Sequence, residues 1–175
     1  MRVYGAILLY LISDYAFAEK VPQAYREIGA RYGVPHQIIY AVAKVESQRY
    51  IEQIKIARPW PWTLNIEGKP YFYSTKMQAV MALEEYLRGG GRSVAVGIMQ
   101  IYWRWHSEKL INPELALDPY YNIEIGTAYL KKKYRDSGYN WLAAIGKYHC
   151  EETSEENRVR ALNYRKKVIN VLERL

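Results

Sequence analysis

Apolar residues recur every three or four positions along most of the chain, which is the spacing of helices with one buried face. Capping residues, glycines and prolines break this pattern into segments. It predicts a helix from Val21 and Pro22 to Arg31, a second that carries Glu46, and a third that follows a Ser74 cap and ends at residues 89–91. Further helices are predicted from Asn122 to Tyr134, from Trp141 to about Tyr148, and through Ala161 to Leu175.

Residues 58–73 do not follow the helical pattern, because their prolines exclude a regular helix. Two short runs, residues 62–66 and 71–73, flank a Glu67-Gly68 turn and predict a small β-hairpin. No β-α-β alternation, repeat or low-complexity linker occurs elsewhere. We therefore expect a mainly α fold, a single helical domain with one small β-hairpin insert.

Glu46 stands inside an apolar helical stripe, four residues after Val42 and seven after Ile39. Burial penalises a charged carboxylate, so a buried Glu46 would have a raised pKa, as a general acid requires. The alternative is a structural carboxylate at the rim of the stripe, paired with a cation such as Arg49. The stripe alone favours the structural alternative.

The first eighteen residues have the layout of a secretory signal peptide. Arg2 is followed by an apolar run over residues 3–12 and by an Ala-x-Ala site that ends at Ala18. We expect cleavage after Ala18 and a mature domain of residues 19–175 outside the cytoplasm, in the periplasm. The alternative is an N-terminal core helix. No later segment is apolar enough to be transmembrane.

The chain of 175 residues carries a net charge of +7, and removal of residues 1–18 leaves that charge unchanged because one Arg and one Asp are lost. For an exported protein this charge indicates an acidic surface or polymer rather than nucleic acid. The 18 tyrosines suit a groove that holds polar rings. Cys150, the single cysteine, has no intramolecular disulfide partner, and His36, His106 and His149 lack metal-ligand spacing, so we expect no metal and no cofactor.

Four motifs occur in a characteristic order: residues 33–35 leading to Ala-Lys-Val-Glu-Ser at 43–47, Gly-Ile-Met-Gln at 97–100, Asn-Ile-x-x-Gly at 122–126, and Ala144 with Tyr148. Together they resemble the lytic transglycosylases of the soluble, lysozyme-like type. The resemblance implies a lysozyme-like catalytic domain over residues 19–175, with residues 58–91 as a hairpin-helix insert. The Pro-Trp-Pro-Trp run and residues 103–106 look like the branch found in integrating conjugative elements and type IV secretion systems.

The resemblance also implies the reaction, cleavage of the β-1,4 bond between N-acetylmuramic acid and N-acetylglucosamine in peptidoglycan. Glu46 would protonate the leaving oxygen, the substrate's N-acetyl group would stabilise the cationic centre, and ionised Glu46 would take the C6 hydroxyl proton as a 1,6-anhydro ring closes. This is a substrate-assisted exception to the usual two-carboxylate scheme. The sequence has no second carboxylate at a matching motif position.

The family's substrate-binding positions carry over to Ser47, Gly97, Met99, Gln100, Asn122 and Tyr148. Tyr148 is expected to bring its hydroxyl near Glu46 and help set its protonation. The alternatives are a surface serine for Ser47, core filling for Met99 and Tyr148, and a helix cap for Asn122, which we favour over a sugar ligand. Ala95, Tyr102 and His149 depart from residues common in the family and its branch, which puts substrate contacts in doubt.

Three other functions remain open at this point. A hydrolase on the same fold would give a reducing end, and a catalytically idle peptidoglycan-binding component of an envelope machine would keep the groove without the chemistry. Nucleic-acid binding has the net charge in its favour but conflicts with export and has no matching motif. We expect a monomer whose partner is peptidoglycan, with secretion or conjugation proteins as further partners.

Overall fold

The computed structural model describes residues 19–175, so the predicted signal peptide lies outside the described residues. The helices, in chain order, are α1 Gln23–Tyr32, α2 His36–Ser47, α3 Lys76–Arg88, α4 Trp103–Leu110, α5 Pro113–Ala116, α6 Pro119–Asp136, α7 Trp141–His149 and α8 Glu155–Leu172. The strands are β1 Gln48–Ile51, β2 Ile56–Pro59, β3 Thr63–Ile66, β4 Lys69–Phe72, β5 Val94–Val96 and β6 Ile101–Tyr102, with a 3-10 turn at Glu52–Ile54. The predicted mainly helical class is confirmed.

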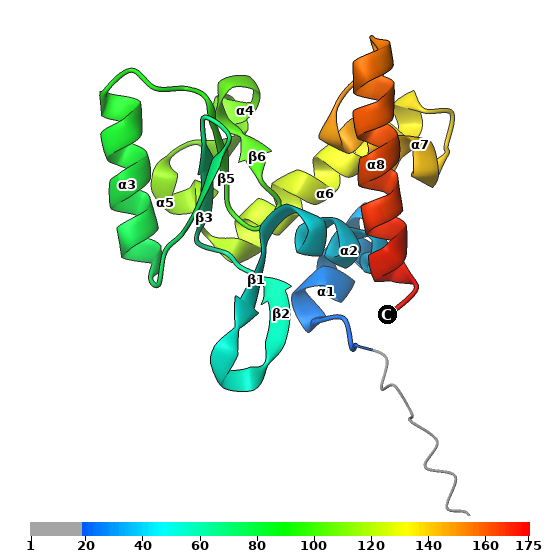
Figure 1. The fold of residues 1–175 in the computed structure, drawn as a ribbon, viewed down its shortest axis with the longest axis horizontal. Coiled ribbons are helices and arrows are strands. Elements are labelled where there is room, and N and C mark those ends of the chain that lie inside the picture. The colour runs from blue at the N-terminus through cyan, green and yellow to red at the C-terminus, as the bar shows by residue number, and fades with distance from the viewer. Residues whose placement is uncertain (1–18) are drawn as a thin grey trace, which may run out of the picture.

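The elements gather on two sides of the molecule. Figure 1 shows the larger sheet with α3, α4 and α5 on one side and α1, α2, α7 and α8 on the other, with α6 running between them. Helix α2 packs against α1 and α8, and α7 packs against both α6 and α8. Among the described helices none combines the length and hydropathy that a bilayer crossing needs.

The β structure is more extensive than the single predicted hairpin. The predicted hairpin forms as β3 and β4, with Thr63 opposite Phe72. Strand β5 then pairs with the other edge of β3, Leu64 opposite Val96, and β6 pairs with β5, which completes a sheet in the order β4-β3-β5-β6. A separate hairpin of β1 and β2 follows α2 directly.

Two predicted helix caps are wrong by a few residues. The cap of α3 is Thr75 rather than Ser74, and it forms a capping box with Gln78. Helix α6 begins at Pro119 with Asp118 as its cap, whose side chain accepts a hydrogen bond from the Tyr121 backbone N–H. Asn122 is therefore not a cap but lies inside the helix and is fully buried.

The core joins the two sides. Ile39 and Val42 of α2, Leu130 of α6 and Ile145 of α7 are fully buried or nearly so, as are Leu64 and Val96 of the sheet. Two methionines of α3 point to solvent and do not belong to its buried face. Met77 and Met81 are 68% and 62% exposed, and α3 buries Ala79, Val80 and Leu83 instead.

Candidate active site

Glu46 lies in the last turn of α2, where that helix meets α8. Its carboxylate oxygen Oε1 accepts a hydrogen bond of 2.6 Å from the Tyr164 hydroxyl. Within residues 19–175 no basic group lies within 4.0 Å of this carboxylate. The Arg49 guanidinium lies over the Trp60 ring instead, 4.8 Å from its centroid. The alternative of a Glu46–Arg49 ion pair is therefore wrong.

The environment of Glu46 favours its neutral form. Burial is the main cause and raises its pKa to about 7, although the Tyr164 hydrogen bond and the positive charge of Lys167 both act to lower it. A carboxyl group with this pKa is present in both protonation states at neutral pH. It can therefore give up a proton and take one back, as general acid–base catalysis requires.

Tyr164 is a candidate site residue that the sequence did not reveal. It lies on the buried face of α8, only 5% exposed, and its ring stacks on His149 of α7 with centroids 4.6 Å apart. Burial and the nearby Glu46 charge raise the pKa of Tyr164 well above its usual value, so the hydroxyl keeps its proton. A tyrosine within an apolar stripe needs a partner for its hydroxyl, and this need was the available signal.

Glu46 lines two cavities that have no other lining residue in common. The larger, of about 680 Å³, is the aromatic arm, and Tyr102, Trp105, Tyr129 and Tyr148 contribute its rings. The smaller, of about 430 Å³, is the basic arm, lined by Lys44, Gln48, Lys167, Asn170 and Arg174, with Val45 and Val171. The acid thus stands at the junction of two cavities of unlike chemistry.

The turn of residues 97–100 forms part of the aromatic arm. Gln100 lines this arm, and its side-chain Nε2 donates to the Gly97 carbonyl at 2.8 Å. Gly97 has φ of +77°, and a Cβ there would lie 2.5 Å from the Asn122 amide, so only glycine fits. The predicted groove-wall position therefore fits Gln100 itself.

Two other predicted site residues, Ser47 and Asn122, hold this turn in place from inside the protein. Ser47 is buried, and its hydroxyl donates to the Ile98 carbonyl at 2.7 Å. The Asn122 side chain accepts from the Met99 N–H at 2.8 Å and donates to the Val96 and Ala116 carbonyls. Met99 and Asn122 are fully buried, so neither presents a surface to a ligand.

Tyr148 lies close to Glu46 but does not bond to it. Its hydroxyl donates to the Met99 carbonyl at 2.8 Å, while the neighbouring Glu46 charge contributes to raising its pKa. Tyr148 also lines the aromatic arm. Tyr148 was expected near Glu46, and the hydroxyl that donates a hydrogen bond to Glu46 is that of Tyr164.

The part of the sequence that follows the Glu46 helix matches a known family. Residues 67–170, more than half of the chain, match the family described as the transglycosylase SLT domain. The chain belongs to the transglycosylase SLT domain family. No curated protein and no solved structure gives a significant match.

The SLT match covers Gln100, Asn122, Tyr148 and Tyr164 but begins after Glu46. Membership of the family supports a lytic-transglycosylase-type activity on peptidoglycan. Glu46 is therefore a candidate acid on its geometry alone, namely its place in the lining of both arms, the Tyr164 bond and the raised pKa.

The three departures from the family pattern all line one cavity. Ala95, Tyr102 and His149 line the aromatic arm, and the Tyr102 hydroxyl lies 2.9 Å from that of Ser93. Cys150 also lines this arm, with its Sγ 3.4 Å from the Asn157 carbonyl. The described residues contain no cluster of three metal-ligating side chains. The departures thus alter what this SLT domain presents to a ligand in the aromatic arm.

Proposed function

We propose that the protein is a peptidoglycan lytic transglycosylase that cleaves the β-1,4 bond between N-acetylmuramic acid and N-acetylglucosamine and leaves a 1,6-anhydro end. The observation that carries this proposal is the single carboxyl group of Glu46, with a pKa of about 7, at the junction of two cavities. A glycan strand that occupies both arms would place one glycosidic bond beside this carboxyl.

The reaction needs two proton transfers through one carboxyl group, the first from Glu46 and the second to it. Because Tyr164 donates to Oε1, the Oε2 atom of Glu46 is the oxygen that carries the acid proton. Glu46 gives this proton to the glycosidic oxygen as the bond from C1 breaks, and the N-acetyl oxygen of the muramic residue stabilises C1. The C6 hydroxyl oxygen then bonds to C1, and its proton returns to Glu46. No water is consumed.

The other carboxylate of the aromatic arm, Glu151, is already engaged. It is ion-paired with Lys133, whose side chain is only 9% exposed. A hydrolase with two catalytic carboxylates would need a second free carboxylate beside the bond. The engagement of Glu151 therefore favours a scheme with one carboxylate.

The place of action follows from the sequence. The cationic start, apolar run and Ala-x-Ala site of residues 1–18 support export and a periplasmic location. The segments around Trp60 and Trp105 resemble the branch of conjugative elements and type IV secretion systems. We infer local opening of the wall for such an apparatus.

The test is digestion of purified peptidoglycan by the mature chain, residues 19–175, with mass spectrometry of the muropeptides. Anhydro products from the wild type and a loss of about a thousandfold in Glu46→Gln would support the proposal, since general acid–base catalysis contributes on this scale. Products heavier by one water would establish a hydrolase instead.

Glu151→Gln is the matched control, because it removes a carboxylate from the same cavity without touching Glu46. It should stay active, with folding checked by circular dichroism because Lys133 loses its partner. If Glu151→Gln is as inactive as Glu46→Gln, the scheme with one carboxylate fails. A wild type that binds sacculi but releases no product would be the idle binding component.

A further inference from the structure

The basic arm is chemically unsuited to a bare sugar ring. Its lining has no aromatic side chain, and its apolar residues are Val45 and Val171. Sugar rings usually pack on aromatic faces, and the aromatic arm offers several of these. The basic arm presents ammonium, guanidinium and amide groups instead, which are donors suited to an anion.

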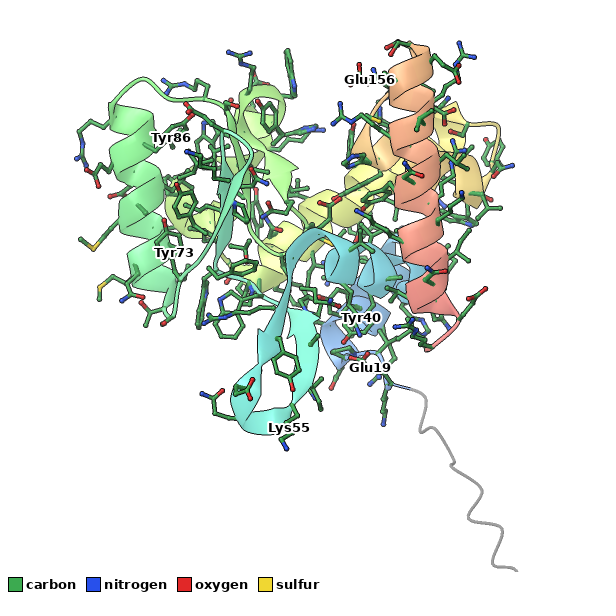
Figure 2. The ribbon with its side chains drawn as sticks, viewed as in Figure 1. Glu19, Tyr40, Lys55, Tyr73, Tyr86 and Glu156 are labelled. Carbon is green, nitrogen blue, oxygen red and sulfur yellow. The ribbon has the colours of Figure 1, made fainter. Side chains whose placement is uncertain are left out.

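Two cations of the basic arm have no acidic partner. Lys44 is paired with Glu19 at 2.5 Å, and Glu19 also accepts a hydrogen bond from Tyr40, beside which Figure 2 draws it. Lys167 and Arg174 are exposed, and within residues 19–175 neither has a carboxylate within 4.0 Å. The arm therefore keeps two uncompensated positive charges.

Helix α8 brings these cations into register with the acid. Tyr164, Lys167 and Val171 follow one another at intervals of three or four residues, so they share one face of the helix. Arg174 lies in the turn just after α8, where its backbone N–H donates to the Val171 carbonyl. Tyr164 is at the acid, while Lys167 and Arg174 line the basic arm.

Where an amidase has removed a stem, the glycan keeps one lactyl carboxylate on that muramic acid residue. Where the stem is present, that carboxyl is bound as an amide, and the anions of the strand come from its substituents. In peptidoglycan these are the carboxylates of the peptide stems carried by the muramic acid residues. We propose that the basic arm is a binding site for stem-peptide carboxylates, with Lys167 and Arg174 as the residues that recognise them. The inference rests on the proposed function and adds a preference for strands that keep their peptides.

The test compares two forms of one substrate, soluble glycan strands with their stems and the same strands after an amidase has removed them. The wild type should have a higher kcat/KM on stemmed strands. The double variant Lys167→Gln with Arg174→Gln should lose roughly four- to twenty-fold on stemmed strands, because each exposed charge pair contributes about two- to five-fold. On stripped strands the double variant and the wild type should differ by less than this.

Lys166→Gln is the matched control. Lys166 is an exposed lysine of the same helix that lines neither arm, so its loss removes the same charge without touching the site. Equal losses on both substrates, or a loss in Lys166→Gln as large as in the double variant, would overturn the inference. A wild type without preference for stems would do so as well.

A binding measurement separates this inference from the proposed chemistry. In the Glu46→Gln background, equilibrium binding of stemmed and stripped strands is measured with and without Arg174→Gln. Weaker binding of stemmed strands alone supports the stem site, even if the wild type releases no product and the transglycosylase proposal fails. Unchanged binding of both substrates in Arg174→Gln refutes the stem site, even if the wild type is fully active.

Discussion

The two arms share Glu46 but differ in almost everything else. The aromatic arm is built mainly from α4, α6, α7 and the sheet, and six of its sixteen lining residues carry rings. The basic arm is built from the end of α2 and the end of α8 and has no ring in its lining. Glu46 thus lies between a cavity with many rings, which Glu151 and Arg160 also line, and a cavity that offers charged and amide groups but no ring.

The difference in chemistry between the two arms indicates how a substrate would be placed. Stacking on a ring depends on buried area and is insensitive to salt, whereas attraction between exposed charges is screened. An enzyme that uses both can hold a polymer by its sugars and discriminate it by its substituents.

The largest expected effect is on stability at the junction of the arms. The pKa of Glu46 is raised from 4.5 to about 7, so folding favours the protonated form. The stabilisation of the protonated state is complete below pH 4.5 and is lost as the pH rises to 7, a change of about 3 kcal/mol. Glu46→Gln cannot ionise, so from pH 4 to 8 it should gain about this much stability relative to the wild type, measured by urea unfolding.

Glu84→Gln, which removes an exposed carboxylate from α3, controls for the loss of one negative charge. If the stabilities of Glu46→Gln and the wild type run parallel across this pH range, Glu46 is not desolvated in the folded protein.

A smaller effect, roughly tenfold in kcat/KM, is expected from Tyr164→Phe. The Tyr164 hydrogen bond lowers the pKa of Glu46, so its removal should raise that pKa above about 7. Because the first step needs protonated Glu46, the alkaline limb of the pH profile should move to higher pH as activity falls.

Tyr148→Phe is the informative counterpart, since the Tyr148 hydroxyl bonds to the Met99 carbonyl. Its alkaline limb should stay nearer to that of the wild type. A shift in Tyr148→Phe without one in Tyr164→Phe would return the tuning role to Tyr148.

About a fivefold loss is expected from Trp105→Ala, which removes a ring from the aromatic arm. Trp105 is 73% exposed, so its removal should affect binding more than folding. The loss should be equal on stemmed and stripped strands and independent of salt. Met77→Ala, an exposed apolar residue outside both arms, should have no effect. A loss confined to stemmed strands would contradict the division between the arms.

The smallest effect is that of salt. The preference of the wild type for stemmed strands should fall about twofold between roughly 0.01 M and 0.15 M salt, because the screening length shortens from about 30 to 8 Å. Kinetic assays on both substrates at each salt concentration measure it. A preference that grows with salt would indicate apolar recognition of the stems.

The sequence predicted the structural features that are determined by residues close together in the chain. The stripe of Ile39, Val42 and Glu46 predicted a carboxyl group on a buried helix face, because a helical period is visible within a dozen residues, whereas the proposed role as acid came from the family resemblance. The hairpin of β3 and β4 was visible for a similar reason, since one turn joins its strands. Strands β5 and β6 were missed because they have only three and two residues. In addition, β5 pairs with β3, from which it is separated in the sequence by β4 and α3.

The roles of polar residues were harder to predict than their positions. Asn122 was expected at a helix start, but its amide bridges Met99, Val96 and Ala116, contacts that the folded chain alone brings together. In the sequence, Tyr164 is only one more residue of the apolar pattern of its helix. Its partner lies 118 residues earlier in the chain, and no sequence period connects the two.

That separation has a consequence for how activity first arises. Glu46 belongs to the second helix and its donor Tyr164 to the last, so a chain synthesised from its N-terminus holds the carboxyl long before the hydroxyl that orients it. Contacts of such long range form after the intervening chain has been brought together. A partly emerged or incompletely folded molecule therefore lacks the bond between Tyr164 and Glu46, and the proposed activity would appear only once the last helix has packed.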